Sequence, residues 1–170
     1  MSEKRIPNPT LMARLKLSVK GVDWAASLVA HKQHEQPDGE WSAHQHLVHL
    51  IAVDTEVYRP RVQAMLDTDR PVFGMWVGET FMVDRYTMRE GDILVLAETF
   101  MREREKLVEI FKSLTSEQWS RTGTWPDGEV DVAWAAERAL SHGLEHFTAL
   151  LFLHQELEHF HARQWLADGQ

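Results

Sequence analysis

Two histidines four residues apart, inside a long apolar stretch, most constrain what this chain can fold into. His142 and His146 lie in ALSHGLEHFTALLFLH, residues 139–154, among leucine and phenylalanine residues. Four residues of an α-helix advance about 6 Å and turn about 40° past a full circle, so both imidazoles would share one helix face. A buried imidazole without a partner is costly. The pair therefore predicts either hydrogen-bonded core histidines or two ligands of a metal site.

Apolar residues recur at three- and four-residue steps in four segments, which predicts four helices. The first runs from about residue 11 to 32. The second runs from 42 to about 66, and Pro60 should kink or divide it because proline lacks a backbone donor. The third runs from about 91 to 113 and the fourth from about 132 to 166. Four helices with mostly short joints predict an all-α four-helix bundle, in which metal sites lie between facing helices.

The connection between the second and third predicted helices, residues 67–89, is long and rich in aromatic residues. Proline and glycine interrupt its periodicity, which indicates a packed loop with a role at a pocket. We expect a short helical turn after a capping box at Thr115, and a hairpin at residues 126–128. Residues 1–9 contain two prolines and should form an extended lead-in to a single domain spanning 1–170.

The composition narrows the class of partner. A net charge of −8, with no separate cluster of Lys and Arg, argues against a nucleic-acid partner. The longest nearly uncharged apolar run, residues 147–153, is too short to span a bilayer, and no signal-peptide pattern is present, so we expect a cytoplasmic protein. The absence of cysteine excludes disulfides, thiolate ligands and a cysteine nucleophile. The charged run Arg102–Lys106 predicts a solvated helix face.

His49 is the best candidate for a third metal ligand. It lies two turns into the second predicted helix, in an apolar sequence that follows a capping box of Ser42 and Gln45. His46, one turn earlier, is a weaker candidate, and His44 should lie at the surface. Three neutral imidazoles leave a coordination position open for water, which is typical of catalytic zinc sites. Imidazole also suits nickel, iron and copper.

Two other motifs compete with this interpretation. HGLEH at residues 142–146 matches the H-x-x-E-H pattern of inverzincin proteases, which needs a downstream third ligand and a larger protease body. ELEH at residues 156–159 matches half of a di-iron bundle motif, which needs a second copy and two more glutamates. We expect neither. The sequence also lacks a G-x-S-x-G elbow, so we do not expect a Ser-His-Asp hydrolase.

The order and spacing of these motifs resemble the DinB/YfiT-like superfamily of metal-binding four-helix bundles. The resemblance rests on GEWS at residues 39–42 leading into HLVHL at 46–50, and on WPDG at 125–128 before the helix with the histidine pair. It implies homodimers and, where activity is known, thiol-dependent chemistry. It also implies a divalent metal ion, zinc or nickel with iron possible, on three ligands: His49, His142 and His146.

Two classes of function follow from the sequence and the resemblance. The first is a metal-dependent thiol S-transferase, or a related enzyme, that uses an external low-molecular-weight thiol because the chain has no cysteine. Glu145 could orient a ligand or exchange protons, with Asp54 and Glu56 as weaker candidates. Four aromatic residues could wall a pocket for a small-molecule substrate: Trp76, Phe81, Tyr86 and Trp125. The second class is a non-enzymatic, stress-related dimeric bundle with a structural metal ion.

Overall fold

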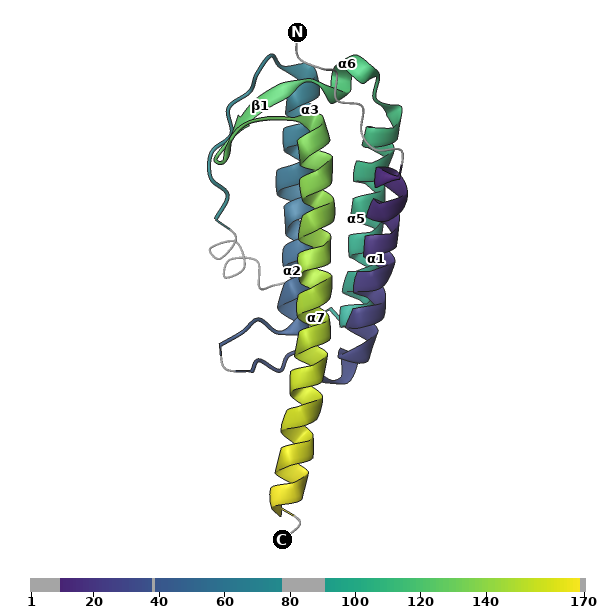
Figure 1. The fold of residues 1–170 in the computed structure, drawn as a ribbon, viewed down its shortest axis with the longest axis vertical. Coiled ribbons are helices and arrows are strands. Elements are labelled where there is room, and N and C mark those ends of the chain that lie inside the picture. Colours follow the sequence, from purple (N-terminus) through teal and green to yellow (C-terminus); the bar gives the residue numbers. More distant parts are fainter. Residues whose placement is uncertain (1–9, 38, 78–90, 169–170) are drawn as a thin grey trace.

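The computed structural model describes residues 10–37, 39–77 and 91–168, and its helices form the columns of a bundle (Figure 1). This confirms the predicted all-α four-helix bundle, with α2 and α3 sharing one column. The lead-in predicted for residues 1–9 lies outside the described residues. The elements are α1 (Leu11–Leu28), the 3₁₀ turn η1 (Ala30–Lys32), α2 (Ala43–Val53), the π turn η2 (Asp54–Tyr58), α3 (Arg59–Asp67), α5 (Ile93–Ser113), α6 (Ser116–Trp119), β1 (Thr122–Trp125), β2 (Gly128–Asp131) and α7 (Val132–Asp168).

The long helices pack around a common core. α1 packs along α5 and α7, and α2 packs along the same two helices, so α1 and α2 occupy opposite corners. The last turns of α7 continue past the end of the other columns (Figure 1). The hairpin expected at residues 126–128 is present as antiparallel β1 and β2. None of the described helices is both long and apolar enough to cross a membrane.

The π turn η2 divides the second helical column next to the proline that predicted a break. The N–H of Arg59 donates to the carbonyl of Asp54, and Pro60 falls in the first turn of α3, where its missing donor costs little. Val53 and Tyr58, at the two ends of the turn, are both buried. Five residues of a regular α-helix turn about 140° past a full circle, so these two side chains could not share a face without the widened turn. The turn therefore absorbs one residue and keeps the apolar face of α3 toward the core.

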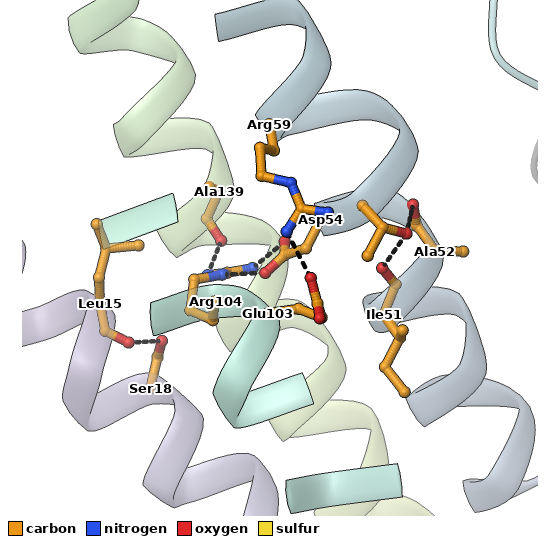
Figure 2. A network of polar contacts seen from close by, with 10 residues as sticks. Leu15, Ser18, Ile51, Ala52, Asp54, Arg59, Glu103, Arg104 and Ala139 are labelled. Atoms are coloured by element: carbon orange, nitrogen blue, oxygen red, sulfur yellow. Dashed lines mark hydrogen bonds and ion pairs between the residues drawn. The ribbon is translucent and has the colours of Figure 1, made fainter. Parts of the chain in front are cut away.

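A polar layer lies between two apolar clusters of the core. One cluster contains Phe100 and the other contains Phe111, one on each side of Arg104 along α5. Arg104 and Asp54 are each 1% exposed and form a bidentate ion pair, with Nε–Oδ2 and Nη2–Oδ1 distances of 2.6 and 2.8 Å. Arg104 Nη1 also donates to the carbonyl of Ala139 at 2.9 Å (Figure 2). One guanidinium thus connects α5, η2 and α7.

The burial of Arg104 shows that the solvated face predicted for residues 102–106 was wrong at this position. Arg104 lies four residues after Phe100 and three before Leu107, both of which are buried, so it belongs to the apolar stripe of α5. It can face the core because Asp54 supplies a buried carboxylate. The neighbours that remain exposed, as predicted, are Arg102, Glu105 and Lys106.

Removing one partner of the ion pair should destabilise the protein strongly. Arg104→Met leaves the Asp54 carboxylate buried without its cation, which costs about 3–5 kcal/mol. Arg102→Met, on the exposed face of the same helix, should change the free energy of unfolding by less than about 0.5 kcal/mol. Urea unfolding followed by circular dichroism measures both values.

The double variant Asp54→Asn/Arg104→Met is the control for unpaired charge. Its loss of stability should be smaller than the sum of the two single losses, because no charge is left buried alone. Equal losses in Arg102→Met and Arg104→Met would contradict a stabilising ion pair.

Candidate metal centre

The first turn of α2 is fixed by the predicted capping box. Ser42 Oγ accepts from the N–H of Gln45 at 3.2 Å, and Gln45 Oε1 accepts from the N–H of Ser42 at 2.8 Å. The preceding Trp41 packs its ring against His46, with centroids 5.6 Å apart, as expected for a staple. It also contacts His49 at 4.9 Å. The cap and the tryptophan therefore fix the part of α2 that carries the candidate ligand.

The structure buries His44, and the surface position predicted for it was wrong. The side chain is 3% exposed. Its Nε2 lies 3.0 Å from the carbonyl of Gly91, and its ring packs against His34 with centroids 4.7 Å apart. The segment before α5 covers the first turn of α2, which the spacing within α2 could not indicate.

Three imidazoles from α2 and α7 converge on one point. His142 Nε2 lies 3.1 Å from His49 Nε2 and 3.1 Å from His146 Nε2. The three residues each offer one ligand atom, and these atoms all lie within 4.8 Å of one another. The structure thus brings together the three histidines that spacing and resemblance selected.

The converging nitrogens fit a divalent cation. Nitrogen ligands about 2.0–2.1 Å from a tetrahedral zinc ion lie roughly 3.3 Å apart. The 3.1 Å between His142 Nε2 and each of the other two Nε2 atoms is close to this value. A single hydrogen on His142 Nε2 can satisfy only one of its two close contacts, whereas a cation accepts every lone pair at once. The Nδ1 atoms of His49 and His142 are buried and have no hydrogen-bond partner among the described residues. Protein groups alone therefore leave the cluster incompletely satisfied.

Burial keeps the clustered imidazoles neutral. It lowers the pKa of His46 and His49 to about 4, that of His142 to about 3 and that of His146 to about 2. In His142 and His146 a smaller part of this lowering of the pKa comes from repulsion by neighbouring imidazoles and by Arg138. A neutral imidazole keeps the lone pair that a metal ion needs, so these side chains need not lose a proton on binding.

His46 lies beside the trio and contacts its outer side. The Nδ1 atoms of His46 and His146 are 2.8 Å apart, a hydrogen-bond distance. This contact holds the His146 ring with its Nε2 toward the other two ligands, as partners of metal-bound histidines commonly do. Trp41 and Trp76 pack on His49, with centroid distances of 4.9 and 5.7 Å. Aromatic side chains therefore cover part of the cluster.

A cavity of about 260 Å³ lies against two of the three histidines. Trp76 and Trp125, which the sequence proposed as pocket walls, both line it, whereas Phe81 and Tyr86 lie outside the described residues. A larger cavity of about 710 Å³ lies by Glu156 on the projecting part of α7, and its lining includes none of the trio. The smaller cavity is lined by His49, Val53, Val57, Tyr58, Arg61, Met75, Trp76, Trp125, Pro126, Asp127, Trp134, Arg138 and His142.

The acidic candidates lie in different surroundings. Glu145 is 53% exposed and accepts hydrogen bonds from Arg138 Nη1 at 2.9 Å and Ser141 Oγ at 3.1 Å, so its catalytic role stays a prediction. Asp54 is committed to the buried ion pair with Arg104. Glu56 is half-buried in the π turn.

Several polar residues of the cavity were not among the site residues predicted from the sequence. Tyr58, Arg61 and Arg138 line it together with the histidines. Arg138 could have been found, because Trp134, Arg138, His142 and His146 recur at four-residue steps along one helix. Tyr58 and Arg61 could not, because the π turn shifts the helical period between them and His49. Most of the polar residues that line the cavity could thus be identified only from the fold.

A model of the DinB superfamily matches residues 19–150, which include all three converging histidines. The chain belongs to the DinB superfamily. A solved structure, YfiT from Bacillus subtilis, matches this chain with a TM-score of 0.80 and 16% sequence identity, over 93% of each chain. YfiT is described as a probable metal-dependent hydrolase with an unusual four-helix bundle topology. At this identity the likeness establishes the fold, and no curated protein matches the sequence.

The metal-free protein should lose stability as the pH falls below about 6.5. Histidines of the unfolded chain gain a proton near that pH, whereas the clustered ones stay neutral in the folded state down to about pH 4 or below. Their folded pKa is the lower one, so the unfolded state binds more protons and the stability present above pH 6.5 is lost on acidification. Each such histidine contributes up to about 1.4 kcal/mol per pH unit.

Urea unfolding of chelator-treated protein between about pH 7 and pH 5 measures this slope. His46→Phe removes one titrating group and should make the slope shallower than that of the unsubstituted protein. A free energy of unfolding that does not change over this range would contradict neutral burial of the cluster.

Proposed function

We propose that this protein is a metal-dependent enzyme whose divalent ion is held by His49, His142 and His146. Zinc or nickel is the expected ion, with iron as an alternative. The observation that carries the proposal is the convergence of three imidazole Nε2 atoms beside a cavity of about 260 Å³. Imidazole nitrogen is a preferred ligand of all three metals.

The ligand set favours a catalytic ion over a structural one. Structural zinc sites are usually closed by four protein ligands. Among the described residues this cluster offers three histidines, and the neighbouring His46 directs its Nδ1 to His146 and not to the point where the Nε2 atoms meet. The cavity reaches His49 and His142, so a small molecule has a path to the open position.

Thiol-dependent group transfer is the reaction that we propose for this site. A divalent ion would act as a Lewis acid and lower the pKa of a thiol or water molecule that it coordinates. The chain contains no cysteine, so the sulfur would come from a low-molecular-weight thiol as cosubstrate. Trp41 and Trp76 shield His49, and His46 orients His146. Hydrolysis is the alternative, in which water replaces the thiol, and YfiT is described as a probable metal-dependent hydrolase.

Other features of the proposed enzyme stay predictions. One of them is the exchange of protons by Glu145, whose Oε1 accepts a hydrogen bond from Arg138. The homodimer and the cytoplasmic location expected from the sequence and the resemblance are untested, as is the alternative of a stress-related bundle with a structural metal.

Substitution of a ligand should abolish metal binding. Protein purified without an affinity tag should carry about one divalent ion per chain by elemental analysis, and His49→Ala and His142→Ala should each carry almost none. His159→Ala, on the exposed far part of α7, is the matched control and should keep full metal content. His46→Phe should keep the ion but bind it about 10–100 times more weakly. Unchanged metal content in the two ligand variants would show that the site assignment is wrong.

Cobalt substitution separates the thiol and water hypotheses. A thiol that coordinates cobalt should add a sulfur-to-metal charge-transfer band, and the visible spectrum should change when a small thiol such as glutathione or cysteine is added. The same addition to His142→Ala should produce no band. If every thiol tested leaves the spectrum of the cobalt protein unchanged, group transfer loses its support and hydrolysis becomes the better proposal.

A further inference from the structure

We propose that the cavity beside the histidines binds a small organic carboxylate, whose charged end is held by Arg61, Arg138 and the indole N–H of Trp125. The apolar body of the ligand would lie against the tryptophan rings of the cavity. The proposal names a substrate class for the proposed metal centre. It rests on the proposed function only because it treats the bound carboxylate as a substrate.

Arg61 is a partly buried cation in the cavity wall. Its guanidinium carbon lies 4.7 Å from the centroid of the Trp125 ring and 5.3 Å from that of Phe73, and its Nη2 donates to the carbonyl of Gly74 at 2.7 Å. No carboxylate of the described residues forms an ion pair with it. Burial lowers the pKa of Arg61, so its charge is held at a cost that a bound anion would offset. A planar guanidinium fixed in this way can bind a carboxylate with two parallel hydrogen bonds.

Trp125 supplies a buried donor that lacks an acceptor. The side chain is 6% exposed, and its Nε1 has no hydrogen-bond partner in the part of the chain that the structure describes. Strand β1 holds the ring between Tyr58 and Trp134, with centroid distances of 6.0 and 5.2 Å. An unsatisfied buried indole N–H is costly, and a carboxylate oxygen in the cavity would accept from it.

Arg138 makes the charge of the lining positive. It lies on α7 one turn before His142, and its Nη1 donates to Glu145 Oε1 at 2.9 Å. Because Glu145 is 53% exposed, solvent screens this ion pair, and the other guanidinium donors can serve a ligand. The lining contains one carboxylate, Asp127, which is exposed at the hairpin turn, against the two guanidinium groups. This balance favours an anion over a cation.

The walls and size of the cavity favour an organic carboxylate over an inorganic anion. Trp76, Trp125 and Trp134 all line it, and flat aromatic walls suit a flat apolar ligand body. The volume of about 260 Å³ is below the roughly 300–1,000 Å³ of typical drug-binding pockets, so the ligand is small. Inorganic phosphate would meet the charges but would leave the aromatic walls without a partner.

Calorimetric titration with phenylacetate and its neutral isostere phenylacetamide tests the proposal. Each is titrated into the full chain in metal-free and zinc-loaded forms, because a carboxylate could also coordinate the ion directly. Phenylacetate should bind both forms, and phenylacetamide should bind each at least roughly tenfold more weakly. Arg61→Met and Arg138→Met should each weaken phenylacetate binding by roughly tenfold or more in the metal-free protein. Trp125→Phe, which keeps the ring but removes the N–H, should weaken it less.

The exposed Arg102→Met is the matched control and should bind phenylacetate as the unsubstituted protein does. Unchanged zinc content and melting temperature would show that the arginine variants are folded.

The proposal is overturned if phenylacetate binds neither form, if the amide binds equally well, or if inorganic phosphate binds more tightly than phenylacetate. It is also overturned if phenylacetate binding needs zinc and is unchanged in both arginine variants. If the protein binds phenylacetate but takes up no zinc when zinc is supplied, the proposed function is refuted and the carboxylate site stands. If the protein binds zinc but not phenylacetate, the carboxylate site is refuted and the proposed function stands.

Discussion

The ion pair between Asp54 and Arg104 is the interaction on which the geometry of the bundle depends. It connects α5 to the π turn and, through the carbonyl of Ala139, to α7, in the layer between the two apolar clusters. A buried charge is tolerated only beside its partner, so a helix that slid or rotated would leave a charge unpaired. The pair therefore selects one alignment of the helices. In that alignment His49, five residues before the aspartate, meets His142, three residues after the alanine.

The histidine cluster is preformed by packing. α7 supplies two of its members from one unbroken helix, and α2 supplies the third from a helix whose first turn is capped. Trp41 and His46 hold the rings from the outer side. Crowded neutral imidazoles are an unfavourable arrangement that the surrounding core sustains, and a ligand set already in place loses little entropy when an ion binds. The same cluster therefore lowers the stability of the metal-free fold and favours the binding of a metal ion.

Features that depend on local periodicity could be predicted from the sequence, and features that depend on distant partners could not. Apolar spacing predicted the helices, and the capping box at Ser42 predicted where α2 begins. The exposure predicted for Arg104 and His44 was wrong because their partners, Asp54 and Gly91, are 50 and 47 residues away in the chain. The histidine trio could be chosen because its members interrupt apolar runs. The arginines that line the cavity could not be chosen from the sequence. A charged residue on a helix is usually solvated, and only the fold shows which charged residues are covered.

The π turn makes the second helical column tolerant of a change in chain length. Because the widened turn absorbs one residue, α2 and α3 keep their faces toward the core as they would in a regular helix with one residue fewer. A residue could therefore be lost from residues 54–58 without rotating His49 on one side or Arg61 on the other. What such a deletion would alter is the turn itself, and with it the direction of the Asp54 carboxylate. The orientations of His49 and Arg61 thus do not depend on the extra residue. Asp54 and the cavity-lining Val57 and Tyr58 lie in the turn itself and would move with it.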